Sequence, residues 1–453
     1  MSAKLSTAGA SAYGGFATSG PPLGAAHEVP VEPNVLRRVL TASFIGNFVE
    51  WFDYASYGYF ATVIAHAFFP EIAPAAALLA TFAVFAISFI VRPIGGIVWG
   101  GIGDRIGRRT ALSYSILIMS GATTLIAFLP SYAQVGMLAP ILLLLVRMVQ
   151  GFSASGEYAG ATAFIAEYSP TSRRGFYTSM VPASTAAGLL VGSLMSAGLF
   201  ALLSEAQMQS FGWRLPFLLA APLGLIGLYI RLKLEDTPKF RELEETHHVA
   251  ATPVREMFTT YRREILIAFG VTCLNAVGFY LILSYMPTYL ITELGMGQTE
   301  SFIATSVSLA VYIGLIFLMG QLSDRFGRKT ALIAASVLFI LLTVPLFAML
   351  EGSTLLVIIL IQIAFGALLT INDGTLPCFL SEIFPTKVRY SGFAFSFNTA
   401  NALFGGTAPF VATWLIGVTG SKLAPAWYLV AAAAVALVAM LMSRETAGKP
   451  LAD

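Results

Sequence analysis

Five ionisable residues interrupt stretches of sequence that are otherwise apolar. They are Glu50, Asp53, Arg92, Arg147 and Glu157. In the centre of a bilayer such a side chain is costly unless it has a partner or lines an aqueous cavity. Glu50 and Asp53 are three residues apart, so they share one face of a helix. We interpret the five as lining a cavity that holds both signs of charge, and buried ion pairs that only join helices are the alternative.

A carboxyl group inside a membrane can carry a proton. Burial favours its neutral form, and a nearby arginine favours its charged form. A group that alternates between two such surroundings would bind and release a proton. We therefore predict Glu50 or Asp53 as the proton carrier, and we place Glu157 with them because it follows Arg147 and Gln150 on one polar stripe of a helix.

Other side chains in the apolar stretches suit the recognition of a small charged molecule. Arg92 and Arg147 fit a carboxylate, since a guanidinium offers a planar pair of donors. Aromatic rings could hold a quaternary ammonium by cation–π attraction, although most rings in a membrane protein belong to its core or interfaces. We predict that the substrate-binding residues are Trp51, Tyr57, Arg92, Arg147, Gln150, Asn275, Tyr280, Asn398 and Asn401.

The elements that must position these residues are long apolar segments. A membrane-spanning helix needs about 20 mostly apolar residues. The sequence predicts twelve such segments, at 40–66, 75–100, 111–130, 137–167, 175–203, 213–233, 264–290, 301–322, 330–350, 354–383, 390–417 and 424–443. Strands of a membrane barrel would be shorter and would alternate in polarity. The predicted fold class is therefore an all-α membrane protein with twelve transmembrane helices.

The composition excludes several kinds of protein. Apolar residues make up 57% of the 453 and charged residues 11%, against roughly 45–50% and 25% in a soluble domain. The net charge of +2 gives no reason to expect a nucleic-acid partner. The sequence has no phosphate-binding G-x-x-x-x-G-K-[ST] loop, so we expect no ATP-driven step. Its four histidines are not spaced as metal ligands, and we expect neither a metal nor another cofactor.

The distribution of basic residues predicts the orientation. If the N-terminus is cytoplasmic, 22 of the 26 lysines and arginines lie in cytoplasmic segments and two in external loops. Such a bias places both termini on the cytoplasmic side. We predict a disordered cytoplasmic tail at 1–37, six-helix halves at 38–233 and 264–443, a cytoplasmic linker at 234–263 and a second tail at 444–453.

Two motifs occur once in each half. VWGGIGDRIGRRTAL at 98–112 resembles LMGQLSDRFGRKTAL at 318–332, and EYSPTSRR at 167–174 resembles EIFPTKVR at 382–389. The first motif follows the second span of each half, and the second follows the fourth. Glycines in the first motif allow a tight turn and a positive φ. Its aspartate and arginines can form charge-assisted hydrogen bonds. Two parallel halves around a central site are one recurring transporter plan.

The doubled G-x-x-x-D-R-x-G-R-[RK] loop resembles the signature of the major facilitator superfamily. GNFVEWFDYASYGY at 46–59 and RMVQGFSASGEYAGA at 147–161 narrow the resemblance to the metabolite:proton symporters, as do FIVRPIGG at 89–96 and FPTKVRYSG at 384–392. The resemblance implies a cytoplasmic gate that locks the halves together while the outside is open. The expected gating residues are Gly100, Asp104, Arg105, Gly107, Arg108, Glu167, Arg174, Asp324, Arg325, Arg328, Glu382 and Arg389.

We therefore predict a proton-coupled importer of a small polar metabolite in the bacterial inner membrane, with a lipid bilayer, protons and the substrate as its partners. The rings near Glu50 and Asp53, with SYMPTYL at 284–290 and ETAGKPL at 445–451, favour a zwitterion such as proline or betaine. ANALFGGTAP at 400–409 looks closer to the citrate and oxoglutarate members, so a di- or tricarboxylate stays an alternative. A membrane-embedded enzyme and a channel are alternatives in other classes.

Overall fold

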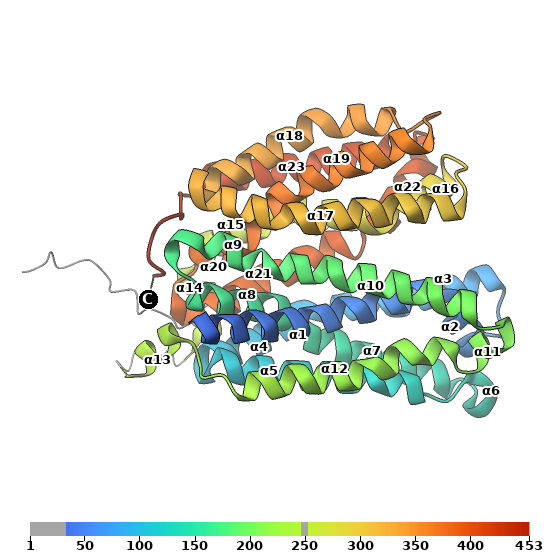
Figure 1. Ribbon diagram of the computed structural model, residues 1–453, viewed down its shortest axis with the longest axis horizontal. Helices are drawn as coiled ribbons and strands as arrows, with labels where there is room; N and C mark the ends of the chain where they lie inside the picture. The colour runs from blue at the N-terminus through green and yellow to red at the C-terminus, as the bar shows by residue number, and fades with distance from the viewer. Residues whose placement is uncertain (1–32, 246–251, 453) are drawn as a thin grey trace, which may run out of the picture. The chain divides into compact units, whose positions relative to one another are not determined.

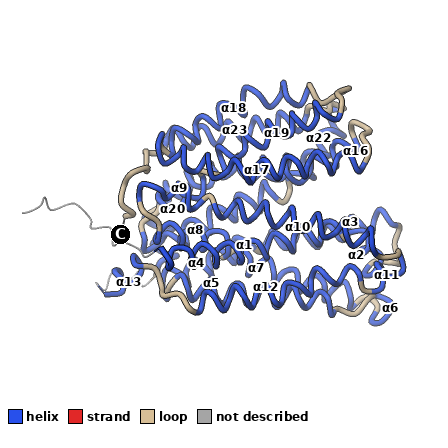
Figure 2. Tube along the Cα trace, in the orientation of Figure 1, coloured by secondary structure: helices blue, strands red, loops and turns tan. Residues whose placement is uncertain are grey.

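Helices account for all regular secondary structure in residues 33–245 and 252–452, the parts of the chain that the computed structural model describes (Figures 1 and 2). Of the tail predicted at 1–37, residues 1–32 lie outside the described ranges. Residues 33–37 form the start of the first helix. The all-α prediction is confirmed.

The elements before the linker form six consecutive groups. They are α1(Pro33–Tyr59) with α2(Ala61–Phe68); α3(Pro74–Ile90) with α4(Arg92–Ile106); α5(Arg108–Phe128); α6(Tyr132–Val135), α7(Leu138–Ala154) and α8(Glu157–Tyr168); η1(Thr171–Arg173), α9(Arg174–Thr178) and α10(Met180–Leu202); and α11(Glu205–Ser210), η2(Gly212–Arg214) and α12(Leu215–Leu232). Two short helices, α13(Pro238–Glu245) and α14(Pro253–Thr260), lie in the linker.

Six further groups follow the linker. They are α15(Arg262–Gly278), η3(Phe279–Tyr285) and α16(Met286–Thr292); α17(Gln298–Phe326); α18(Arg328–Ala348); α19(Leu355–Asp373) with α20(Leu376–Ile383); η4(Thr386–Val388), α21(Arg389–Ala400), η5(Asn401–Gly405) and α22(Ala408–Thr419); and α23(Ala424–Met442). The order of long helices therefore repeats before and after the linker.

Eleven helices of the described residues are long and apolar enough to cross a membrane. They correspond to the second to twelfth predicted segments. The first segment is also helical, as α1 and α2, but it is not among the eleven. Its polar residues lower its mean hydropathy. They include Asn47, Glu50 and Asp53, which are all buried. The segment that is least suited to lipid therefore carries four of the predicted functional residues, Glu50, Trp51, Asp53 and Tyr57, and all four are buried.

Several of the long helices are interrupted in the middle. The fourth group breaks between α7 and α8, and the tenth breaks between α19 and α20. The seventh and eleventh contain the π-helical segments η3 and η5, a distortion that often marks functional sites. The ring of Tyr280 in η3 lies so close to Gly405 in η5 that a Cβ at Gly405 would be 2.7 Å from it. These breaks put irregular backbone next to the buried polar residues.

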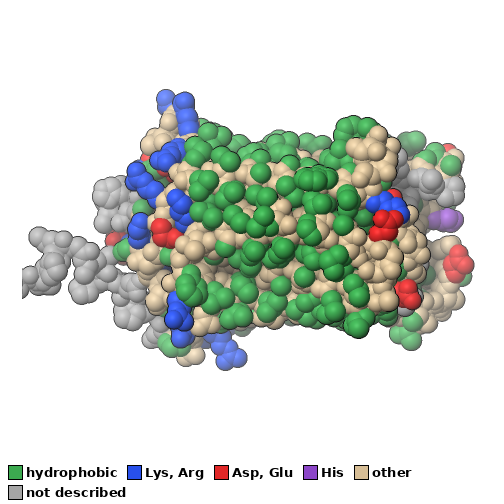
Figure 3. Space-filling model, turned by 90° about the horizontal axis from the view of Figure 1, so that it is seen from above, with side chains coloured by type: hydrophobic (Ala, Val, Ile, Leu, Met, Phe, Trp, Pro, Cys, Tyr) green, Lys and Arg blue, Asp and Glu red, His purple; other side chains and the backbone are tan. Residues whose placement is uncertain are grey.

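The outer surface has an apolar middle and charged ends. On the face seen in Figure 3, apolar side chains cover the middle, and most lysines and arginines gather at the end where α13 and α14 lie. We call this the linker end. Large apolar side chains such as Leu202, Phe410 and Leu266 are at least two-thirds exposed. Lipid would cover such a surface in a membrane, since exposure of this extent to water is unfavourable.

Close packing joins the helices before the linker to those after it. α10 lies against α17, and α4 and α8 lie against α21. Glycines make the second contact possible: a Cβ at Gly100 would lie 2.5 Å from the Cα of Ser391, and one at Gly103 would lie 2.0 Å from the ring of Tyr390. Gly107 has φ +106°, as expected for the turn of the motif. The glycines of the loop thus serve close approach to α21 as well as the turn.

Candidate functional site

The first buried ion pair joins α1 to α4. A guanidinium nitrogen of Arg92 donates to Glu50 Oε1 and, at 3.0 Å, to the hydroxyl of Tyr54. The guanidinium also lies 4.7 Å from the ring centroid of Phe89, a cation–π distance. Glu50 and Arg92 are 2% and 3% exposed. The break between α3 and α4 places Arg92 at the first residue of α4, opposite Glu50.

The second buried ion pair joins α1 to α7. Arg147 Nη1 lies 2.9 Å from Asp53 Oδ2 and donates at 2.6 Å to the side-chain oxygen of Gln150. Gln150 in turn donates at 2.6 Å to Thr123 of α5. The guanidinium lies 4.2 Å from the ring centroid of Tyr57. Three predicted substrate-binding residues, Tyr57, Arg147 and Gln150, therefore form one cluster with Asp53.

Glu157 belongs to a third cluster. It accepts hydrogen bonds from Arg231 of α12 and, at 3.1 Å, from Ser115 of α5. The sequence interpretation placed Glu157 on one stripe with Arg147 and counted Arg231 among the 22 basic residues of the cytoplasmic segments. The structure corrects the second point, because Arg231 is 2% exposed and neutralises Glu157. The sequence could not reveal this pair, since its members are 74 residues apart in different segments.

An aromatic cluster fills the space between α1 and the π-helical segment η3. The ring centroid of Trp51 is 5.0 Å from that of Phe279 and 6.3 Å from that of Tyr280, and Phe89 lies 5.8 Å from Tyr280. We call Trp51, Tyr54, Phe89, Phe279 and Tyr280 the aromatic junction. It brings the predicted residues Trp51 and Tyr280 close to Arg92, whose guanidinium lies against Phe89 of the same cluster.

Several buried polar atoms of this region have no hydrogen-bond partner among the described residues. They are Trp51 Nε1, Tyr280 Oη, Glu50 Oε2 and Arg92 Nε. In the second pair, three further buried atoms have no hydrogen-bond partner among the described residues. They are Asp53 Oδ1 and the Nε and Nη2 of Arg147. Buried polar groups are normally paired, so such a concentration needs an explanation. Donors and acceptors of both charges are available here to a polar molecule.

The predicted asparagines lie in three different environments. Asn275 of α15 donates at 2.7 Å to Asp373. Asn398 donates at 2.8 Å to the backbone oxygens of Ser155 and Ala394, and Asn401 donates to the backbone of its own helix. Asn398 therefore joins the α7–α8 break to α21. The structure places none of the three in the aromatic junction.

At the linker end, Asp104 of the first predicted gate contacts the start of α21. Its carboxylate accepts the backbone N–H groups of Tyr390 at 3.1 Å and Ser391 at 2.7 Å, at the start of α21, and pairs with Arg108. A negative group is stabilised at a helix N-terminus by the helix dipole and the free N–H groups. The expected charge pairing of Asp104 is thus present, but a backbone contact that the sequence did not predict accompanies it.

Asp324 makes the reciprocal contact. Its carboxylate accepts the backbone N–H groups of Gly175 at 2.8 Å and Phe176 at 2.9 Å, near the start of α9, and pairs with Arg328. Each repeat aspartate therefore binds the N-terminus of a helix on the other side of the linker. The equivalent arginines Arg105 and Arg325 are exposed and take no part in these contacts.

The second motif supplies two buried glutamates to the same end. Glu167 accepts hydrogen bonds from Arg108 at 3.2 Å and from Arg389 at 2.7 Å. Glu382 accepts from Arg174 at 2.9 Å and from Arg328 at 3.3 Å. Arg389 and Arg174 each reach across to the other side of the linker. The four predicted gating carboxylates and four of the six predicted gating arginines therefore form two ion-pair clusters, which together we call the linker-end network.

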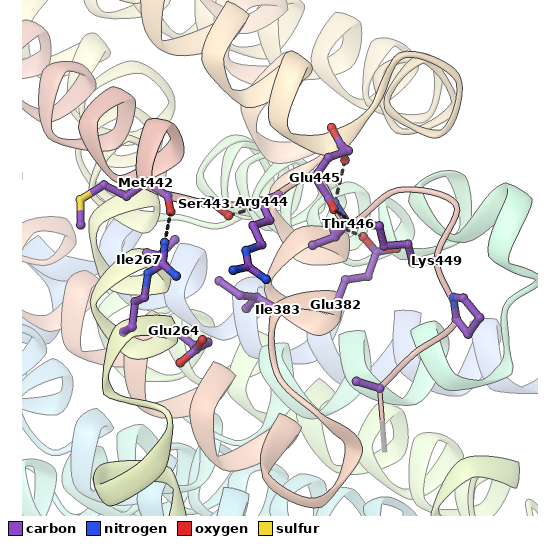
Figure 4. Close-up of a pocket in the computed structure, with 13 residues that line it drawn as sticks. Glu264, Ile267, Glu382, Ile383, Met442, Ser443, Arg444, Glu445, Thr446 and Lys449 are labelled. Carbon is purple, nitrogen blue, oxygen red and sulfur yellow. Dashed lines mark hydrogen bonds between the residues drawn. The ribbon is translucent and has the colours of Figure 1, made fainter. Parts of the chain in front are cut away.

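Residues that the sequence analysis missed complete this network. Asp236 in the linker accepts the backbone N–H of Arg108 at 3.0 Å, and Thr237 donates to Glu167. Burial raises the pKa of Asp236 above its ordinary value. After the twelfth span, Glu445 accepts the N–H groups of Arg328 and Lys329 at 2.9 and 3.0 Å. Thr446 donates to Glu382 at 2.7 Å (Figure 4). The sequence feature that could have revealed these residues is an acid followed by a threonine, which occurs after the last long helix of each half.

The last residues of the chain also line a pocket of about 470 Å³ at the linker end. Its wall is formed by the start of α15, the ends of α20 and α23, and residues 443–452 (Figure 4). No group of three potential metal ligands is present among the described residues. The pocket shares no lining residue with the aromatic junction, and two of its three acidic residues, Glu382 and Glu445, hold arginine and backbone partners.

Comparison with known proteins gives a consistent result. The family model of the Major Facilitator Superfamily matches residues 43–398 and 268–451. The "Glycine betaine/proline/ectoine/pipecolic acid transporter OusA" of Dickeya dadantii is 39% identical over 433 residues, which cover 93% of this chain and 86% of that protein. The "Proline/betaine transporter" of Escherichia coli K12 is 36% identical with the same coverage.

Solved structures agree on the fold. The solved structure of the proton:xylose symporter XylE bound to 6-bromo-6-deoxy-D-glucose matches with a TM-score of 0.77, covering 92% of this chain and 98% of that chain. The sequence identity is 17%, so this likeness concerns the arrangement of helices alone.

Proposed function

The chain belongs to the Major Facilitator Superfamily, and we propose that it imports a zwitterionic compatible solute, such as proline or glycine betaine, together with protons. The relatives that are 36–39% identical to it over most of its length carry names of proline and betaine transporters. The predicted di- or tricarboxylate substrate has no counterpart among these names. The same names favour a transporter over the membrane-embedded enzyme that the sequence left as an alternative.

The observation that carries this proposal is the aromatic junction beside the Glu50–Arg92 pair. A zwitterion needs a cationic partner for its carboxylate and rings or an acid for its ammonium group. Arg92 supplies the first, and the rings of Trp51, Phe279 and Tyr280 supply the second. Because Trp51 comes from α1 and the other two rings come from η3, a ligand here would contact both halves of the protein.

The same pair offers a way to couple substrate to protons. In the structure Glu50 occupies the guanidinium of Arg92. A proton on Glu50 would release that guanidinium, which could then bind the carboxylate of the substrate. Substrate and proton would therefore bind together. The Asp53–Arg147 pair, which has its own unpaired donors, is the second group to which the sequence assigns coupling, and Glu157 is the third.

The network at the linker end would act as the gate. Asp104 and Asp324 each hold a helix from the other half, so separating the halves at this end breaks both contacts and the Arg174–Glu382 and Arg389–Glu167 pairs. Opening towards the linker end would require these bonds to be exchanged for water. We propose that this end faces the cytoplasm of a bacterial inner membrane, as the basic residues predict.

Uptake by purified protein in liposomes tests the proposal. Labelled glycine betaine or proline should enter in a saturable manner when an inward pH gradient is imposed, and excess citrate or oxoglutarate should not compete. Trp51→Ala should weaken betaine uptake, whereas Trp427→Ala, on the exposed face of α23, should not. Uptake of a dicarboxylate but of neither zwitterion would refute the proposed substrate, while the proposal of a proton symporter would stand.

A further inference from the structure

One buried acid in the second half has no cationic partner among the residues that the structure describes. Asp373, at the last residue of α19, is 1% exposed. Its Oδ1 accepts a hydrogen bond from Asn275 of α15 at 2.7 Å, and its Oδ2 accepts one from the hydroxyl of Tyr312 of α17 at 2.6 Å. Three helices therefore converge on this carboxyl group, and each of its oxygens has one neutral partner.

The charged surroundings of Asp373 can be stated element by element for the described residues. α17 presents Tyr312 and α15 presents Asn275, while α18 and η3 present no ionised group to it. From the first half, the phenol of Tyr158 on α8 is the titratable group within its electrostatic range. No lysine or arginine of the described chain forms an ion pair with Asp373, in contrast to Glu50, Asp53 and Glu157.

Neutral partners permit a protonation that arginine partners resist. A guanidinium can only donate, so it holds an acid in its ionised form. A hydroxyl can donate to a carboxylate or accept from a carboxylic acid. The contact between Tyr312 and Asp373 can therefore persist in both protonation states. An isolated ionised carboxylate would otherwise be costly in a buried site.

The location of Asp373 connects it to the central region. It lies immediately before the break between α19 and α20, and both polar atoms of the fully buried Asn372 have no partner among the described residues. Tyr158, which lies next to Glu157 in sequence, is under the electrostatic influence of both Asp373 and Glu50. Its ring is stacked on Phe397 of α21 at 4.4 Å. Tyr158 of the first half therefore packs directly against α21 of the second half.

We propose that Asp373, held by Tyr312 and Asn275, is a second cation-binding site of this symporter and that its cation is a proton. This inference rests on the proposed function and extends it, because the sequence assigned coupling only to acids of the first half. A sodium ion would need several more oxygen ligands, typically backbone carbonyls of an unwound helix. Here an amide N–H and a hydroxyl already occupy the two carboxylate oxygens.

The number of coupled protons can be measured in liposomes with the full-length protein. With valinomycin and equal potassium on both sides, the membrane potential is zero, and the limiting accumulation of labelled glycine betaine is recorded over a series of pH gradients. Each coupled proton contributes about tenfold accumulation per pH unit. Asp373→Asn should lower accumulation by about tenfold at a gradient of about one unit, while exchange of labelled for unlabelled betaine without a gradient continues.

The outcomes separate this inference from the proposed function. If the parent protein does not accumulate betaine under a pH gradient, the proposed function fails. If the parent does so and Asp373→Asn shows the same dependence on the gradient, the second site is refuted while the symporter stands. A sodium requirement of the parent that Asp373→Asn abolishes would also overturn the assignment of the cation.

If Asp373→Asn also loses exchange, its loss of accumulation could reflect a folding defect. A second variant then tests the proposal. Tyr312→Phe keeps the carboxyl group and removes one donor to its ionised form, so the pH of half-maximal uptake should rise. Tyr285→Phe is the matched control, since that hydroxyl contacts Thr413 elsewhere in the same half. An unchanged pH profile in Tyr312→Phe, or an equal shift in Tyr285→Phe, would refute the proposal.

Discussion

The two halves of this protein are alike at the linker end and different in the middle of the helices. At the linker end, Arg108 and Glu167 of the first half correspond to Arg328 and Glu382 of the second. In the middle, the first half neutralises three buried acids with three arginines. The second half has Asp373, with a tyrosine and an asparagine as its partners.

This difference separates two tasks. A gate between two halves works through contacts that each half offers to the other, so both halves need the same groups there. Recognition of one asymmetric molecule has no such requirement, and each half can contribute a different chemistry. The repeat is therefore retained where the halves hold each other and lost where the proposed substrate and protons bind.

The largest effect should follow from removing an arginine in the middle of the first half. Arg147→Met leaves Asp53 buried without its cation, and breaking a buried pair in this way costs about 3–5 kcal/mol. We expect lost transport and a large fall in thermal stability in detergent. The double variant Asp53→Asn with Arg147→Met removes both charges and should recover most of the stability but not the transport. Equal stability of the single and double variants would contradict the pairing.

Neutralising Glu50 should affect coupling more than folding. Glu50→Gln keeps a hydrogen-bond acceptor for Arg92 and mimics a permanent proton. We expect a loss of accumulation by about tenfold per pH unit, with exchange retained, as measured in liposomes. Accumulation equal to that of the parent would show that the coupled proton binds elsewhere, and Asp53→Asn tests the nearest alternative.

The sequence was sufficient for the apolar spans, the repeat and most of the charged residues that meet at the linker end, although it also named the exposed Arg105 and Arg325. These depend on apolar length, on the recurrence of two motifs and on the placement of charge, which are all local properties. It predicted that Glu50, Asp53, Arg92 and Arg147 would be buried, and the structure joins them as two pairs. Which acid meets which arginine depends on helix packing, and sequence spacing does not reveal it.

Two further features were beyond local reasoning. Arg231 is near the end of a predicted span, so it was counted as a cytoplasmic charge, yet it reaches back to Glu157. The π-helical segments η3 and η5 have no sequence signal that we recognised, although they place Tyr280 beside Gly405. Both features arise from tertiary contacts that override the local pattern.

The reactivity of a single cysteine can test whether the contacts of Asp104 and Asp324 contribute equally to closure of the linker end. In a Cys273→Ala background, Cys378 is the single cysteine, and it is buried at the linker end beside Glu382 at 3.3 Å. Asp104→Asn and Asp324→Asn should each weaken one contact between the halves. A coupling of about 1–3 kcal/mol corresponds to a population shift of about five- to 150-fold, so maleimide should label Cys378 faster in both variants.

The two aspartates should give similar increases because their contacts are reciprocal. Arg105→Gln changes an exposed residue of the same loop and is the control. A faster reaction in only one aspartate variant would show that the two gates differ in strength. Unchanged labelling in both, with normal expression, would refute the role of these residues in closure.

The smallest effect should come from the acid–threonine pairs that follow the sixth and twelfth spans. Asp236 and Glu445 bind free N–H groups at the start of α5 and α18. Loss of a helix cap costs about 0.5–2 kcal/mol, less than loss of a buried ion pair. Asp236→Asn and Glu445→Gln should therefore lower thermal stability slightly and raise Cys378 labelling less than Asp104→Asn does. Arg444→Gln, next to Glu445 but exposed, is the matched control. If Glu445→Gln opened the gate as much as Asp104→Asn, the end of the chain would be a principal lock rather than a support, and the two halves would no longer be equivalent at the linker end.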